Sequence, residues 1–219
     1  MKSSMWYAMC LSAALSATAG AAFGGTFKTI SVLDNDFSDW DDVPVVWTDP
    51  SGDGDPIDVA TVQIANDDTH LYLRLTYHTA VNPNAWPSMM LAFDTDNNAA
   101  TGFDIFGLGV VGSDAGFSND FPFDQRTGFN VGGISAGAAI SPYFTVTTSQ
   151  EYAIARNITY VNDGATVFGE SFTLMFWVDG ATVSDTSGAI SYVFAVPEPT
   201  ALAGLGLGTL LLLRRRHRA

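Results

Sequence analysis

The sequence predicts an all-β protein whose central domain is an antiparallel, jelly-roll-like β-sandwich. Twenty of the 23 acidic residues are Asp, and Asp favours turns whereas Glu favours helix surfaces. Short segments of alternating hydrophobicity recur along the chain, separated by clusters of Gly, Asp, Asn and Pro, which is the pattern of a sandwich or barrel. We find no amphipathic helix and no internal repeat. The sandwich is expected to lie between an N-terminal signal peptide and a C-terminal single transmembrane sorting helix.

The first segment, residues 1–22, has the features of a secretory signal peptide. Lys2 precedes a nearly uninterrupted apolar stretch from Met5 to Leu15, and Ala17–Ala19 and Ala19–Ala21 each offer a small-residue cleavage pattern. We therefore expect export through the inner membrane with processing by signal peptidase. Cys10, the only cysteine of the chain, lies inside this segment. The mature domain can then form no disulfide and perform no thiol chemistry.

The clearest strand of the central domain is His70–His78, where apolar and polar residues alternate. Ile57–Ala65 precedes it, and Asn66-Asp67-Asp68 between them predicts a hairpin turn. The apolar side chains expected to face the core are Leu71, Leu73, Leu75 and Tyr77. The later strands are expected at Met89–Phe93, Gly128–Ile134, Tyr143–Thr147, Glu151–Arg156, Glu170–Asp179 and Ile190–Ala195.

The central domain, residues 26–195, is long enough to bury one hydrophobic core. It is strongly acidic, because it contains 22 of the 23 acidic residues and only four basic ones. The basic residues are Lys28, Arg74, Arg126 and Arg156. So negative a domain is not expected to bind nucleic acid or an anionic membrane surface.

The segment 91–104 begins as a buried strand and ends in a loop rich in side-chain oxygens. Asp94, Asp96 and Asn98 recur at a spacing of two, followed by Thr101 and Asp104. A curling loop with this spacing can turn several oxygens toward one point, and Ca²⁺ takes six to eight oxygen ligands. We therefore predict a Ca²⁺ site here; the alternative is a strand-to-strand turn in which Asp and Asn bond their own backbone.

A second acidic segment precedes the strand expected at Ile57. Asp49, Asp53, Asp55 and Asp58 are close in sequence, and Gly52 and Gly54 between them allow the backbone to curl. Neighbouring carboxylates repel one another unless a cation or a proton neutralises them. These residues form a second candidate metal cluster, which would share one site with Asp94 if the two loops meet. The alternative is a solvated acidic loop.

Three of the four tryptophans of the central domain, Trp47, Trp86 and Trp177, are considered as flat apolar surfaces on which a sugar ring could stack. Trp86 lies in a Pro- and Asn-rich loop sequence, and exposure there is expected. Trp47 is a second candidate contact, whereas the apolar surroundings of Trp177 favour a place in the core. The candidate ligand-binding residues are therefore Trp86 and Trp47.

We expect no enzymatic activity. Gly107–Gly112 matches a dinucleotide-binding pattern but is not followed by a helix pattern, and Gly133–Gly137 matches a nucleophile elbow that requires a later His. The only later histidine is His217, in the C-terminal tail. Glycan hydrolysis remains a distant alternative, because two suitably placed carboxylates suffice for it.

The last 24 residues combine a Pro-Glu-Pro box, an apolar run from Thr200 to Leu213 and an Arg-rich end. Fourteen helical residues rise about 21 Å, which with snorkelling arginines approaches the hydrocarbon core of about 30 Å. This tail, residues 196–219, resembles the PEP-CTERM sorting signal of Gram-negative bacteria, which implies processing by an exosortase and delivery to the cell surface or extracellular matrix. The sorting residues are Val196, Pro197, Glu198, Pro199, Arg214, Arg215 and Arg216.

Between residues 34 and 194 a series of motifs occurs in a fixed order: Asp39-Trp40, Asp49–Asp55 ahead of a strand, Asn66–Asp68 before Leu71–Arg74, Asp94–Asn98 with Thr101-Gly102, and Glu151–Ile154. This order resembles the family 9 carbohydrate-binding-module-like, or DOMON-like, β-sandwiches. The resemblance implies a noncatalytic module with calcium-stabilised loops and a glycan or extracellular polymer as partner. The alternative is a structural or interaction protein of the surface matrix without a specific small ligand.

Overall fold

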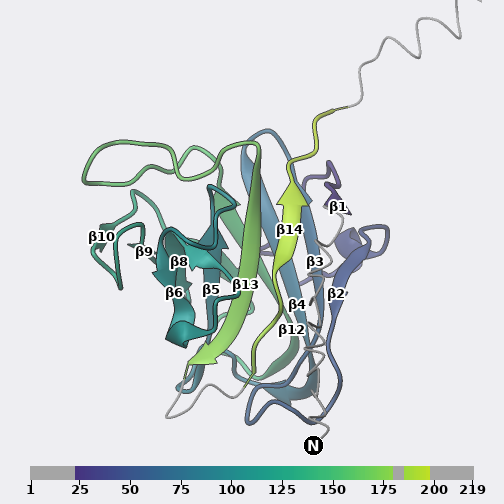
Figure 1. Cartoon of the computed structure of the whole chain (residues 1–219). Coiled ribbons are helices and arrows are strands. Elements are labelled where there is room, and N and C mark those ends of the chain that lie inside the picture. Colours follow the sequence, from purple (N-terminus) through teal and green to yellow (C-terminus); the bar gives the residue numbers. More distant parts are fainter. Residues whose placement is uncertain (1–22, 180–184, 198–219) are drawn as a thin grey trace, which may run out of the picture.

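The computed structural model describes residues 23–179 and 185–197. The predicted signal peptide, the apolar run of the tail, and the sorting residues Glu198, Pro199 and Arg214–Arg216 lie outside these residues. Within the described ranges, no helix is long and apolar enough to cross a membrane. The described chain folds as two β-sheets packed face to face (Figure 1).

The larger sheet has seven strands and the smaller one five, and a two-stranded hairpin lies outside both. In spatial order, the larger sheet consists of β1 (Phe23–Gly24), β14 (Ile190–Val193), β13 (Ser171–Asp179), β5 (Ser88–Asp94), β8 (Ala115–Ser118), β9 (Phe121–Asp124) and β10 (Gly132–Gly133). The smaller sheet consists of β11 (Ala139–Ser141), β12 (Thr147–Ala155), β4 (His70–Val81), β3 (Val59–Asn66) and β2 (Val45–Thr48). The hairpin is β6 (Phe103–Asp104) and β7 (Gly112–Ser113). Two 3-10 helices, η1 (Ser38–Trp40) and η2 (Ile105–Gly107), complete the described elements.

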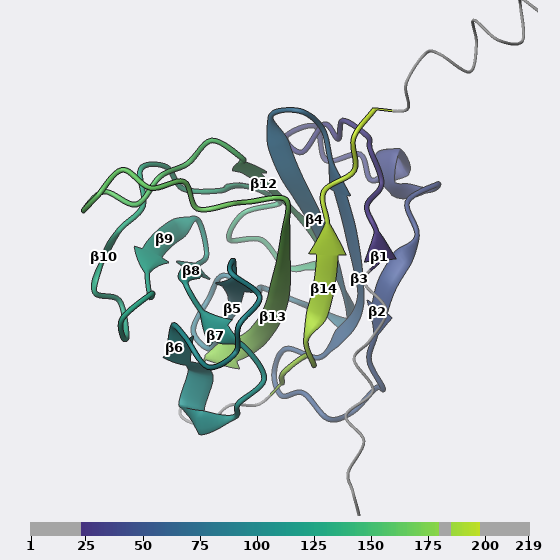
Figure 2. The same ribbon diagram turned by 45° about the horizontal axis from the view of Figure 1, so that its top comes forward.

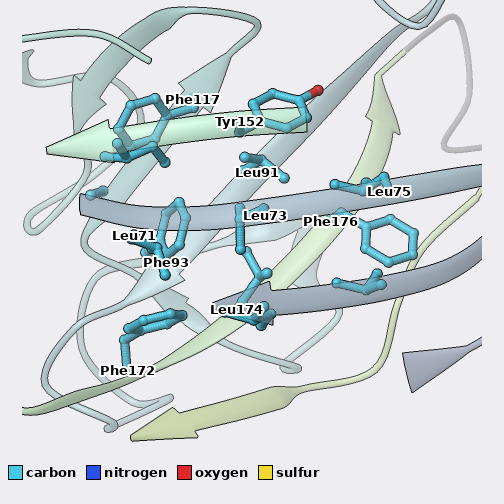
Figure 3. Packing of buried hydrophobic residues seen from close by; sticks show 14 of the residues in the cluster. Leu71, Leu73, Leu75, Leu91, Phe93, Phe117, Tyr152, Phe172, Leu174 and Phe176 are labelled. Carbon is cyan, nitrogen blue, oxygen red and sulfur yellow. The ribbon is translucent and has the colours of Figure 1, made fainter. Parts of the chain in front are cut away.

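All paired strands are antiparallel except β1 and β14, which run parallel. The predicted antiparallel sandwich is therefore confirmed. Its core lies between the sheets, where Leu73 and Leu75 of β4 meet Leu91 of β5 and Leu174 and Phe176 of β13 (Figure 3). Each of these side chains is almost fully removed from water, and burial of one such side chain contributes about 1.5–3 kcal/mol.

The alternation predicted for His70–His78 is confirmed in β4. Its core-facing side chains are buried, and the turn before it is held by Asp67, whose Oδ1 accepts hydrogen bonds from the main-chain N–H groups of Thr69 and His70. The opposite face of the smaller sheet is partly covered by the chain before β2, where Trp40 packs near Tyr72. This cover explains why Tyr72, which points away from the main core, is also buried.

Two of the expected strands are wrong. Of Gly128–Ile134 only the two residues of β10 pair with β9, because so Gly-rich a stretch has few side chains to pack on a sheet. Residues 143–146 are a loop in which Phe144 has a φ of 50°, and β12 begins only at Thr147. The short strands β2, β8, β9 and β11 were also not predicted from the sequence.

The outer face of the larger sheet is partly covered by the β6–β7 hairpin, which lies beside β5 and β13 (Figure 2). Ile105 and Val111 of this cover pack on Ala92 of β5 and on Met175 and Trp177 of β13. The middle of β13 is therefore buried on both faces. This is why its sequence is an unbroken apolar run instead of an alternating one.

The two ends of the described chain meet at one edge of the larger sheet. Asn66, the last residue of β3, is fully buried and receives hydrogen bonds on Oδ1 from the Tyr192 hydroxyl and the Ala195 N–H. Its Nδ2 donates to the Ala195 carbonyl at 2.9 Å. One side chain of the smaller sheet thus fixes the chain where it leaves the sandwich.

Candidate functional site: an aromatic pocket on the outer sheet face

The β6–β7 cover leaves a pocket of about 130 Å³ on the outer face of the larger sheet. Aromatic and apolar side chains form much of its wall, with Trp177 on β13 and Met90 on β5 beside Phe123 and Phe129. Phe129 is 65% exposed and its ring lies 5.2 Å from that of Phe103, which ties this wall to the hairpin. The pocket therefore presents an accessible aromatic surface next to a buried one.

Polar groups also line the pocket. Gln125 Oε1 accepts a hydrogen bond from the Ser113 hydroxyl at 2.7 Å, and Gln125 Nε2 donates to Asn130 Oδ1 at 2.8 Å. Gly116 makes this placement possible, because a Cβ there would lie 2.5 Å from Gln125 Oε1. Asp179 completes the lining, and burial raises the pKa of its carboxyl. Fixed amide groups and a carboxylate beside an aromatic wall can orient a ligand that carries hydroxyl groups.

Trp177 is a buried packing residue and also lines the pocket, and its apolar sequence context predicted only the first of these. It is only 6% exposed, as expected of a core residue, yet its neighbours in the chain, Phe176 and Val178, point into the main core while Trp177 points to the outer face. Its indole Nε1 is buried without a hydrogen-bond partner. The period-two geometry of β13 was the signal that could have placed Trp177 outside the main core.

The two tryptophans predicted as ligand contacts lie away from the lining of this pocket. Trp86 is exposed on the loop between β4 and β5, as expected. Trp47 of β2 packs edge-on against Phe176 in the core, with ring centroids 5.0 Å apart. Its indole therefore supports the core, whereas the indole of Trp86 is open to solvent.

The loop that carries Trp86 is anchored through Asn84. Asn84 Oδ1 accepts hydrogen bonds from the Phe144 N–H at 3.0 Å and from Gln150 Nε2 at 2.7 Å, and its Nδ2 donates to Asn119 Oδ1 at 2.8 Å. Three loops at this end of the sandwich are joined by one buried amide. Nearby, Tyr143 and Phe144 are exposed aromatic residues, with ring centroids 4.7 Å apart.

The predicted Ca²⁺ loop brings together Asp94, Asp96 and a third carboxylate, Asp114. One carboxylate oxygen of each lies within 4.8 Å of the others. Burial raises the pKa of Asp94 to about 6, with the neighbouring Asp96 and Asp114 contributing to the rise and the Asn98 N–H opposing it. Carboxylates this close repel one another unless a proton or a cation neutralises them.

The other residues predicted for this site have different tasks. Asn98 Oδ1 accepts from the Ala100 N–H, so its side chain closes its own turn. The Thr101 hydroxyl donates to Asp96 Oδ2 at 2.9 Å. Asp104 Oδ1 accepts from the Gly109 N–H at 2.8 Å and belongs to the following loop. The sequence missed Asp114, which reaches the cluster because β8 pairs with β5.

In the second predicted cluster, the structure gathers Asp49, Asp53 and Asp58 and leaves Asp55 exposed outside the group. This cluster is separate from that of Asp94. The Asp58 carbonyl accepts a hydrogen bond from the His78 N–H, so this cluster lies near the last residues of β4. The other cluster lies at the last residue of β5, the next long strand. The carboxylates therefore form two separate groups, and the two loops do not share one site.

The fold and the pocket define an all-β sandwich with a partly aromatic pocket on one sheet face. No protein-family model matches the sequence, and no curated protein matches it. Among solved structures, the chain is similar to a family 9 carbohydrate-binding module from Caldicellulosiruptor kristjanssonii in complex with cellotriose. The TM-score is 0.47 and the identity 11%, over 82% of this chain and 96% of that chain. The family resemblance drawn from the sequence motifs remains a prediction.

Proposed function

We propose that the protein is an exported, noncatalytic module that binds a carbohydrate or another hydroxyl-rich extracellular polymer in the pocket lined by Trp177 and Phe129. The observation that carries this proposal is the combination of an exposed aromatic ring, Phe129, with fixed polar groups on Gln125 and Asn130 in one concave site. An aromatic face offers apolar contact to the C–H groups of a sugar, while amides bond its hydroxyl groups.

The size of the pocket restricts the ligand. Sites for drug-sized molecules occupy about 300–1,000 Å³, and this pocket encloses about 130 Å³. It suits one sugar ring or the end of a chain, with the rest of a polymer in solvent. Asp179 and the high negative charge of the domain disfavour anionic sugars, so neutral glycans are the expected class.

We further propose that Ca²⁺ binds Asp94, Asp96 and Asp114 and stabilises the loop after β5. All three ligands are hard oxygen donors, which suits this ion. Asp94 and Asp114 are buried, and burial raises the pKa of the Asp114 carboxyl as it does that of Asp94. A bound cation would favour the ionised carboxylates and fasten the end of β5 to the segment before β8.

The tail supports export and sorting as part of the same proposal. The Pro-Glu-Pro box, the apolar run and the Arg-rich end have the arrangement of the PEP-CTERM signal. Signal peptidase and an exosortase would be the processing partners, with the inner membrane as a transient location. The cell surface or extracellular matrix of a Gram-negative bacterium would be the destination.

A glycan array probed with the purified protein tests the binding proposal. We expect selective binding of neutral glycans that is lost in Phe129→Ala. Phe106→Ala is the matched control, because Phe106 is 60% exposed on η2 and does not line the pocket. Trp86→Ala tests the tryptophan predicted from the sequence and should also retain binding. Equal binding by Phe129→Ala and wild type would contradict the assignment of this pocket.

A second function, that of a matrix interaction protein without a specific sugar ligand, is favoured by the exposed aromatic side chains of the loops that Asn84 joins. Trp86, Tyr143 and Phe144 are all exposed there. A flat glycan array combined with loss of retention on the cell surface in Trp86→Ala would support this function over sugar binding.

A further inference from the structure

A fourth carboxylate joins the cluster of Asp49, Asp53 and Asp58. It belongs to Asp185, in the segment that leads into β14, and it lies close enough to the Asp49 carboxyl to raise the pKa of that group. Asp185 is buried, and its Oδ2 also accepts a hydrogen bond from the Val59 N–H at 2.8 Å. Four acidic groups from two distant parts of the chain therefore converge where β3 begins.

Two oxygens of this cluster are buried without a hydrogen-bond partner. They are Asp58 Oδ1 and Asp49 Oδ2, and Asp58 as a whole is only 7% exposed. An unpaired buried acceptor costs about 1–3 kcal/mol, and more when it is charged. The Asp94 cluster differs, because none of its described carboxylate oxygens is left buried without a partner.

No basic side chain of the described residues forms an ion pair with this cluster. Lys28 pairs with Asp42, and Arg126 with Asp124 and Asp163. The other two arginines are engaged elsewhere, Arg74 with Ser149 and Gln63, and Arg156 with the Asp67 carbonyl. His78 Nε2 lies 3.0 Å from the main-chain oxygen of Asp49 and donates to it. The negative charge of the four carboxylates is thus left without a neutralising side chain.

The backbone of the loop is shaped to hold these groups together. Gly52, with a φ of 97°, donates its N–H to Asp58 Oδ2 at 2.8 Å. At Gly54 a Cβ would lie 2.2 Å from the Ile57 carbonyl oxygen and 3.0 Å from Asp185 Oδ2. Only glycine permits this approach, so the loop is closely fitted around the cluster.

We propose that Asp49, Asp53, Asp58 and Asp185 bind a divalent cation of the Ca²⁺ type, and that this ion clamps the two sheets together. The ligand set is entirely oxygen, which selects a hard cation over Zn²⁺ or Cu²⁺. The 49–58 loop and β3 belong to the smaller sheet. Asp185 is bound to the larger one, because its carbonyl accepts a hydrogen bond from the Val178 N–H of β13. The ion therefore closes the end of the sandwich next to the strand that carries Trp177.

Calorimetric titration and thermal melting of the purified full chain in EDTA, Ca²⁺ and Mg²⁺ test this inference. We expect Asp58→Asn and Asp185→Asn each to bind one Ca²⁺ fewer than wild type, while Asp55→Asn, an exposed neighbour on the same loop, binds as many. In EDTA, Asp58→Asn should melt above wild type, because it removes one of the unneutralised charges. A variant that had merely lost its fold would melt lower.

Crystals of the wild-type protein grown with Ca²⁺ give an independent readout. An anomalous difference peak among the four carboxylates supports the site, and the absence of a peak in Ca²⁺-saturated crystals overturns it. Unchanged stoichiometry in both Asn variants would also overturn it. Neither outcome depends on sugar binding, so failure of the proposed glycan function remains distinguishable from failure of this inference.

Discussion

Replacing Glu151 by Gln should stabilise the protein at neutral and alkaline pH. Glu151 lies on β12, on the sheet face covered by the chain before β2, and is 1% exposed. Neither of its carboxylate oxygens has a hydrogen-bond partner, and the nearby Trp40 Nε1 makes no hydrogen bond of good geometry with it. Arg74 is its cross-strand neighbour, but its Nε donates to Ser149.

The sign of the effect follows from the raised pKa of Glu151. Burial is the main cause that raises the pKa of Glu151 from 4.5 to about 7; Asp34 and Asp39 contribute to the rise, and Trp40 and Arg74 oppose it. Between these pH values the folded state retains a proton that the unfolded state has released, so stability falls as pH rises through the window. At 1.36 kcal/mol per pKa unit, the full penalty above pH 7 is at most about 3 kcal/mol.

The assay compares melting temperatures of wild type and Glu151→Gln from pH 4.5 to 8 in EDTA. For a domain of this size each kcal/mol shifts Tm by roughly 2–4 °C, so the advantage of the variant should grow from near zero to about 6–12 °C. Other carboxyl groups titrate in both proteins, so their contribution cancels in the difference between the two melting temperatures. Glu170→Gln, at an exposed glutamate before β13, controls for net charge. A variant that melts below wild type at pH 8 would refute the reasoning, because it would show an ionised Glu151 that Arg74 stabilises.

Two further predictions concern the tail and the Asp94 cluster. Deleting residues 197–219 should move the protein from the cell surface to a soluble exported pool, as measured by fractionation and immunoblotting; unchanged surface retention would contradict exosortase sorting. Saturating Ca²⁺ at about one hundred times Kd should raise Tm by about 5–11 °C through the Asp94 site, and the double variant Asp94→Ala, Asp96→Ala should lose that contribution. Mg²⁺ at equal ionic strength should act less, since it requires a tighter octahedron; an equal effect of Mg²⁺ would indicate charge screening instead of a site.

The sequence carried the information for the sandwich because its longest strands have one side facing the core. Alternation in β4 predicted the buried face of that strand correctly. The same rule failed in β13, because the hairpin cover buries Met175 and Trp177 on the outer face as well. Short strands such as β9, with four residues, contain too few positions for a period to emerge.

The candidate sites were predictable only where their residues are close in sequence. Asp94 and Asp96 were found by spacing, whereas Asp114 joins them through the pairing of β5 with β8. Asp185 is separated from Asp58 by most of the chain and approaches it only after the sheets have packed. The aromatic pocket likewise depends on the hairpin cover, which no local pattern reveals.

The position of Asn66 would have a mechanical consequence if the protein is held by its tail, as the proposed sorting implies. A pull on the chain beyond Val196 first loads Ala195, which is hydrogen-bonded through both its N–H and its carbonyl to Asn66. Asn66 ends β3 of the opposite sheet, and the Lys28 N–H and Thr26 carbonyl bond its main chain. The load is therefore shared by both sheets at the exit point, instead of peeling β14 from β13 one hydrogen bond at a time. The pocket lies on β13, β5 and β8, strands that such a pull does not reach first, so tension on the tail would leave the pocket undistorted.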